Sequence, residues 1–120
     1  MKRFLVVLGS LPLLALACAD SETTTGGDPR VDGILMLTGN VTAGATSFAS
    51  SCGIGAPCHG ADGSATTGGA DLTTTTGGNS DEFIVSAVVN GYEGMVAQDT
   101  LPDQTVADIL AYMRSEWGGG

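Results

Sequence analysis

The chain has 120 residues, and its thirteen acidic side chains greatly outnumber its four basic ones. An acidic chain of this kind lacks the basic patch that binds phosphates, which excludes nucleic acid as a partner. The length allows one domain, but six aromatic residues provide little material for a large core. A chain this poor in bulky side chains is expected to fold around another molecule.

The first 17 residues are typical of an export signal. Lys2 and Arg3 supply a positive start, and residues 4–16 form an apolar run that is too short for a comfortable membrane span. Small residues before Cys18 resemble a bacterial lipobox, in which the cysteine is lipidated and becomes the new N-terminus. We therefore expect a lipoprotein signal peptide over 1–17 and a lipid on Cys18. The alternative is a cleaved secretory peptide in which Cys18 is an incidental apolar residue.

Export would leave two basic residues, Arg30 and Arg114, against thirteen acidic ones, a net charge near −11. Such a surface can be steered towards a basic partner, and simple solvation of an exported surface explains it equally well. Residues 18–30 are polar and rich in glycine and threonine, which predicts a flexible tether. We expect the domain, over 31–120, to face the periplasm in the bacterial cell envelope, attached to a membrane by the lipid.

The pattern after the tether predicts short elements and long loops. The apolar run over 31–37 is expected to pack as an extended segment. Asn40 or Thr42 can cap a helix over 42–51. Residues 60–79, which are rich in glycine and include a run of threonines, form a loop by composition. Loops of this length in a compact domain are usually functional or wrap a ligand.

Two helices follow with clearer signals. Ser80 is a good N-cap for a helix with an apolar stripe, which ends at Gly91. Residues 91–101 form a loop that contains Met95. The last helix, over about 102–117, has apolar residues at helical spacing, with a proline at its start and glycines at its end. Three short helices joined by long loops predict a small all-α domain.

Cys52, Cys58 and His59 form the motif with the clearest chemistry. A thiol pair closed by an adjacent histidine attaches haem covalently, because the thiols add to the two vinyl groups and the imidazole becomes the proximal ligand of the iron. The usual spacing is C-x-x-C-H, whereas five residues separate the two cysteines here. Three interpretations stay open. Both cysteines form thioethers, only Cys58 does, or haem is absent and a Cys52–Cys58 disulfide closes a small loop.

Several segments resemble class I c-type cytochromes in order and spacing, over about residues 34–117. They are similar to the family's haem-attachment segment, the segment after the haem loop, the loop that supplies a distal methionine, and the C-terminal helix. In this sequence they are residues 48–63, 71–73, 89–95 and 101–114, respectively. The resemblance implies three to four short helices and long loops wrapped around one haem. It also implies a helix crossing in which Gly44 and Phe48 pack against Ile109 and Tyr112.

Carried onto this sequence, the resemblance implies that one haem c is bound covalently through Cys52 and Cys58. His59 would be the proximal ligand of the iron and Met95 the distal one. The resemblance further implies that the backbone carbonyl of Ala70, where relatives often have proline, accepts a hydrogen bond from His59. Such a bond would orient the imidazole and make it a better ligand.

A haem with both axial positions filled has no site for a substrate, so we expect a single-electron carrier and not an enzyme. Its partners would be redox proteins, which a basic docking surface would suit, and the membrane that holds the lipid. One alternative is a haem-free envelope lipoprotein whose small helical domain serves binding or structure and is closed by a Cys52–Cys58 disulfide. Another is a haem sensor or peroxidase with an open distal site, which would require Met95 to lie away from the iron.

Overall fold

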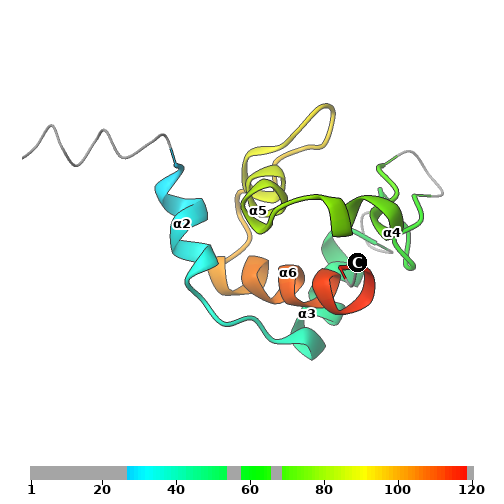
Figure 1. Ribbon diagram of the computed structural model, residues 1–120, viewed down its shortest axis with the longest axis horizontal. Helices are drawn as coiled ribbons and strands as arrows, with labels where there is room; N and C mark the ends of the chain where they lie inside the picture. Colours follow the sequence, from blue (N-terminus) through cyan, green and yellow to red (C-terminus); the bar gives the residue numbers. More distant parts are fainter. Residues whose placement is uncertain (1–26, 54–57, 66–68, 119–120) are drawn as a thin grey trace, which may run out of the picture.

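The computed structural model describes residues 27–53, 58–65 and 69–118, and all structural statements below concern these ranges. The expected signal peptide and the lipidated Cys18 lie outside them. The described chain is all-α, as predicted, and within it no β-strand occurs (Figure 1). Its elements are α2 (Pro29–Leu35), α3 (Val41–Ser51), α4 (Leu72–Thr75), the 3-10 helix η1 (Thr76–Gly78), α5 (Asp81–Asn90) and α6 (Asp103–Trp117).

The caps predicted for two helices are present. Asn40 accepts a hydrogen bond from the backbone N–H of Ala43 and begins α3, and Ser80 accepts one from the N–H of Phe83 and begins α5. Each side-chain oxygen satisfies a donor that the first helical turn would otherwise leave without a partner. The bounds of α3, α5 and α6 therefore fall within one residue of those that the sequence predicts.

The extended segment predicted over 31–37 is wrong. Residues 29–35 form α2, because Asp28 accepts a hydrogen bond from the N–H of Arg30 and Pro29 has the backbone angle that a first helical turn needs. Val31 and Ile34, three residues apart, lie on one face of the helix and are each 1% exposed. Two residues that the sequence assigns to the tether, Pro29 and Arg30, thus belong to the first turn of a packed helix.

The loop predicted over 60–79 also contains regular structure. Asp71 caps α4 by accepting a hydrogen bond from the N–H of Thr73, and η1 continues it to Gly78. The hydroxyls of Thr74 and Thr75 donate to the carbonyl oxygen of Asp71, so the threonine run folds back on its own cap. The composition does not predict these two short helices, because threonine and glycine usually indicate irregular backbone.

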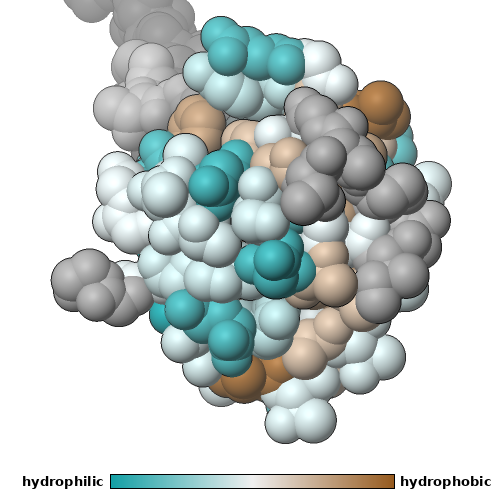
Figure 2. All heavy atoms as spheres, turned by 90° about the vertical axis from the view of Figure 1, so that its right-hand side faces the viewer, coloured by the Kyte–Doolittle hydropathy of each residue, from teal (hydrophilic) through white to brown (hydrophobic). Residues whose placement is uncertain are grey.

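Two clusters of buried apolar residues share α6. One joins α2, α5 and α6, and the other joins the end of α3 to α5 and α6 (Figure 1). The first cluster contains Val31, Ile34, Val85, Val88, Val89, Val106 and Ala107, and the second contains Phe48, Cys52, Ile84, Ile109 and Met113. Figure 2 shows one face of the molecule, on which strongly hydrophobic residues form only small separate patches. None of the described helices has the length and apolar character needed to cross a membrane.

The crossing of α3 over α6 depends on Gly44. A Cβ at this position would overlap the carbonyl oxygen of Asp108 and lie 2.8 Å from the Cβ of Tyr112. Phe48, one turn later, packs its ring 5.5 Å from that of Tyr112 and joins Ile109 in the second cluster. This is the helix crossing that the resemblance implies, and it fixes the direction in which α3 delivers its C-terminal end.

Replacing Gly44 by alanine tests this contact. The added methyl would force α3 and α6 apart, so we expect the free energy of unfolding to fall by about 1–3 kcal/mol, measured by urea denaturation. The matched control is Gly33→Ala in α2, where an added Cβ has no atom within 4 Å. That variant should be stabilised by up to about 1 kcal/mol, because alanine favours a helix interior over glycine. Equal effects of the two substitutions would contradict the close helix contact.

Candidate functional site

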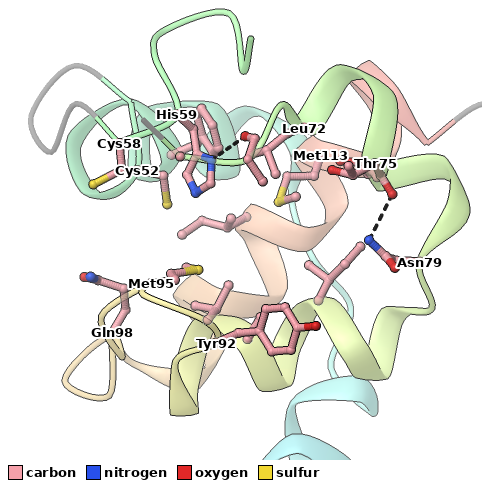
Figure 3. Close-up of a pocket in the computed structure, with 18 of the residues that line it drawn as sticks. Cys52, Cys58, His59, Leu72, Thr75, Asn79, Tyr92, Met95, Gln98 and Met113 are labelled. Carbon is pink, nitrogen blue, oxygen red and sulfur yellow. Dashed lines mark hydrogen bonds between the residues drawn. The ribbon is translucent and has the colours of Figure 1, made fainter. Parts of the chain in front are cut away.

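A cavity of about 850 Å³ lies between the second apolar cluster and the loop after α5. Side chains from α3, α4, η1, α5, α6 and the 91–98 loop line it, and most of them are apolar (Figure 3). The volume falls within the range of pockets that enclose a small organic ligand. All four residues that the sequence predicts to bind haem line this one cavity, namely Cys52, Cys58, His59 and Met95.

His59 is held in one orientation. Its side chain is buried, and its Nδ1 lies 2.9 Å from the carbonyl oxygen of Ala70, the bond that the resemblance implies. A carbonyl only accepts, so Nδ1 carries the proton in this bond. The other ring nitrogen, Nε2, then keeps its lone pair in the neutral imidazole and faces the cavity (Figure 3). His59 thus presents a metal-binding nitrogen to the cavity.

Gly69 makes this arrangement possible. A Cβ at position 69 would overlap the carbonyl oxygen of Cys58 and lie 3.0 Å from Nδ1 of His59. The N–H of Gly69 also donates to that same carbonyl of Cys58, at 2.8 Å. Glycine is therefore needed for the close approach of the two segments that carry His59 and Ala70.

Cys52 lies at the C-terminal end of α3, one turn after Phe48, whose carbonyl accepts the N–H of Cys52 at 2.8 Å. It is 6% exposed, and its sulfur is directed towards the cavity (Figure 3). Burial is the main cause that raises the pKa of the Cys52 thiol to about 11, with a smaller contribution from Cys58. At neutral pH the Cys52 sulfur is therefore a protonated thiol.

Cys58 differs from Cys52 in exposure and direction. Its side chain is exposed, its sulfur points to the outer side of the cavity in Figure 3, and both cysteines are free thiols. The disulfide of the haem-free alternative does not join them in this structure. The backbone N–H of His59 donates to the carbonyl of Cys52 at 3.1 Å, which ties the two ends of the attachment segment together.

Met95 lies on the opposite side of the cavity from His59 (Figure 3). A tight turn presents it, in which Tyr92 and Met95 exchange backbone hydrogen bonds of 3.1 and 2.7 Å. Glu93 and Gly94 form the turn with positive φ angles of 39° and 91°. At Gly91, with φ of 83°, a Cβ would lie 2.7 Å from the carbonyl oxygen of Met95, so this glycine is required as well.

Thr76, which sequence reasoning missed, provides a polar group in the cavity wall. It is 1% exposed, and its Oγ1 is the one buried side-chain oxygen or nitrogen in the described ranges that has no hydrogen-bond partner. Such a hydroxyl costs about 1–3 kcal/mol when it stays unpaired. Nothing in the sequence distinguishes Thr76 from the three threonines before it, because only packing makes it the buried one.

Arg114 holds the turn that carries Thr76. Its guanidinium donates to the carbonyl oxygens of Thr76 and Asn79, at 2.5 and 2.6 Å, and pairs with Asp81 at 2.6 Å. Asn79 and Thr75 also line the cavity and are joined by a 3.0 Å hydrogen bond (Figure 3). The cavity thus has two thiols at one end and a polar turn at the other.

Residues 39–113, more than half of the chain, match the family model described as "Cytochrome C oxidase, cbb3-type, subunit III". The chain belongs to this family of c-type cytochromes. As a cytochrome c it binds haem c covalently, and the site agrees, because an apolar cavity, a free imidazole nitrogen and thiols are groups that can hold haem c, and a thioether can serve as a second ligand. No curated protein and no solved structure gives a significant match to this cytochrome.

The two thiols should differ in reactivity in the haem-free protein. A pKa of about 11 leaves a hundredfold less thiolate than the ordinary value of 9.0, and only the thiolate is alkylated. At about pH 8 we expect Cys52 to react with iodoacetamide about a hundredfold more slowly than an exposed cysteine, and its rate should rise about tenfold per pH unit up to its pKa.

Peptide mass spectrometry, which separates Cys52 from Cys58, measures both rates in one sample. The same protein in concentrated urea is the control, since both cysteines are then exposed and should react alike. Equal rates in the folded protein would contradict the burial of Cys52.

Proposed function

We propose that this cytochrome is a single-electron carrier of the bacterial cell envelope, in which Cys52 and Cys58 attach the haem and His59 and Met95 are the axial ligands of its iron. The observation that carries the proposal is the placement of the His59 ring nitrogen and the Met95 side chain on opposite sides of one apolar cavity. Haem with an imidazole and a thioether ligand has no open position for a substrate and supplies a one-electron redox centre.

The contacts around Cys52 support two thioethers despite the long spacing. Cys52 lies one helical turn after Phe48, at the end of α3, and this position directs its sulfur to the cavity. The hydrogen bond from the N–H of His59 to the carbonyl of Cys52 holds these two residues close together. The three residues in excess of the usual motif therefore need not separate Cys52 from His59. Attachment through Cys58 alone is the second possibility.

Charge supports a redox partner with a basic docking surface. Both arginines of the described chain lie in ion pairs within the domain, Arg30 with Asp103 and Arg114 with Asp81. The acidic residues around them leave a strongly negative surface, which attracts a basic protein. The location in the envelope, with a lipid on Cys18 as membrane anchor, rests on the signal-like N-terminus. The family name refers to an oxidase subunit, and the closed ligand set favours a carrier within or beside such a complex.

The first experiment identifies the haem and its attachment. Protein from a host with the haem-attachment machinery is examined by alkaline pyridine haemochrome spectroscopy and intact mass, and then alkylated after denaturation. We expect the mass of one haem, a spectrum of the two-thioether type, and no alkylation at Cys52 or Cys58. One haem with a red-shifted band and an alkylated Cys52 would show attachment through Cys58 alone. A haem-free chain two hydrogens lighter than its reduced form would support the disulfide lipoprotein instead.

The role of Met95 has its own test. Replacing Met95 by alanine should remove the near-red charge-transfer band of the ferric protein, which arises from a thioether bound to ferric iron, and should lower the reduction potential. Met36→Ala is the control, because Met36 is 86% exposed and does not line the cavity. A band that survives in the Met95 variant would exclude Met95 as the ligand and point to another methionine, such as Met113 in the cavity wall. A ferric unmodified protein that lacks the band would support the sensor or peroxidase alternative.

Thr76, which lines the cavity and has an unpaired hydroxyl, is a candidate to bind a carboxylate of the haem. The vinyl and propionate groups of haem lie at opposite edges of the ring, so attachment at the cysteine end would bring the propionates towards the Thr75–Asn79 turn. The unpaired hydroxyl of Thr76 has no accessible surface in this structure, so it can donate to such a carboxylate once its side chain rotates towards the cavity.

The substitution Thr76→Val tests this by the sign of its effect. If the hydroxyl binds a propionate, the free energy of unfolding of the haem-loaded protein should fall by about 1–3 kcal/mol in urea denaturation. If the hydroxyl stays unpaired, valine should instead stabilise the protein, because it removes a buried polar group without changing the shape. Thr74→Val is the control, since Thr74 is exposed on the same segment and does not line the cavity.

A further inference from the structure

We propose that the segment Asp28–Arg30 is a clamp that holds the loop of Met95 in place from both ends. The segment precedes residues 39–113, the part that matches the family, so the match does not account for it. The proposal rests on the proposed role of Met95, because a loop that supplies an iron ligand must keep that ligand at the iron. Arg30 is a positioning residue in this view, since it contacts the loop and not the cavity.

Arg30 binds the C-terminal end of the loop. Its NH1 and NH2 groups donate to the carbonyl oxygens of Asp99 and Leu101, at 2.9 and 2.7 Å, and its Nε pairs with Asp103 at 2.9 Å. The rigid fork of a guanidinium can make all three bonds at once. Arg30 thereby joins the end of the loop to the first turn of α6, across about seventy residues of sequence.

Asp28 binds the N-terminal end of the loop. The side-chain amide of Asn90, the last residue of α5, donates to Oδ2 of Asp28 at 2.8 Å. Gly91 and the turn that presents Met95 follow directly. The same Asp28 caps α2 through its other oxygen, which accepts the N–H of Arg30. One short segment thus contacts the chain immediately before the loop and again at its end.

The helix that carries the clamp is itself anchored in the core. Val31 and Ile34 belong to the first apolar cluster, and Met95 and Leu101 pack against that same cluster. Without α2, the cluster that supports Met95 would lose Val31 and Ile34, and the loop would lose the hydrogen bonds at its ends. Since ordering a loop costs conformational entropy, fixing both ends reduces the fraction of molecules in which the loop opens.

Arg114 provides a matched control for Arg30. Each arginine pairs with one aspartate and donates to two backbone carbonyls, but Arg114 holds the Thr76–Asn79 turn and does not contact the Met95 loop. Arg30→Gln and Arg114→Gln should therefore weaken the fold to a similar extent. Only the first should loosen the loop.

The experiment compares both variants with the unmodified haem-loaded protein. Imidazole is titrated into the ferric protein, and loss of the near-red band reports displacement of the methionine. Amide hydrogen exchange of residues 91–101, followed by mass spectrometry, reports opening of the loop without reference to the iron. We expect Arg30→Gln to bind imidazole about tenfold more tightly and to exchange faster in this loop, with Arg114→Gln unchanged in both measurements.

Equal behaviour of the two variants, or no change in Arg30→Gln, would overturn the clamp. An unmodified protein that lacks the near-red band would instead refute the proposed role of Met95. In that case the hydrogen-exchange measurement alone decides whether the clamp exists. Faster exchange of the loop in Arg30→Gln only would support the clamp, and equal exchange in both variants would overturn it.

Discussion

The close approach of α3 to α6 determines where the Cys52 end of the site lies. Gly44 lets the two helices meet backbone to backbone, and Gly39 allows the same approach just before α3 begins. Between them, the buried carboxylate of Asp108 on α6 accepts the N–H of Asn40, so the start of α3 is fixed to the middle of α6. With both its start and its crossing point fixed, α3 can end in one place only, and that end is Cys52.

The cavity lies beside this helix crossing and is the space that the small core leaves unfilled. Phe48 and Cys52 form one wall with Ile109 and Met113, while the turn of Met95 closes the other side. With six aromatic residues, the chain has too few large side chains to occupy this space. The haem that a c-type cytochrome carries would complete the core, in the way that metals and cofactors stabilise other small domains.

The sequence predicts the parts of the fold that depend on local rules. The caps Asn40 and Ser80 could be predicted because a capping side-chain oxygen binds backbone groups only a few residues away. Cys58-His59 could be predicted because the two residues form a sequence motif. Met95 and the Ala70 carbonyl came from the resemblance to a family. By contrast, α2 has seven residues, too few to be stable without tertiary contacts, and Arg30 makes its contacts about seventy residues away. Thr76 could not be predicted either, since its burial depends on three elements that meet only in the folded chain.

The pairing of both arginines with aspartates of the same domain affects how the protein approaches a partner protein. Both arginines of the described ranges are paired with aspartates, so the remaining carboxylates leave this part of the chain with a net negative charge. Such a charge attracts an oppositely charged molecule, and salt limits its reach to about 8 Å in physiological solution. At shorter range, contact between the two surfaces adds to this attraction. The edge-to-face pair of Phe83 and Tyr92, half exposed beside the cavity, offers an apolar surface for this contact.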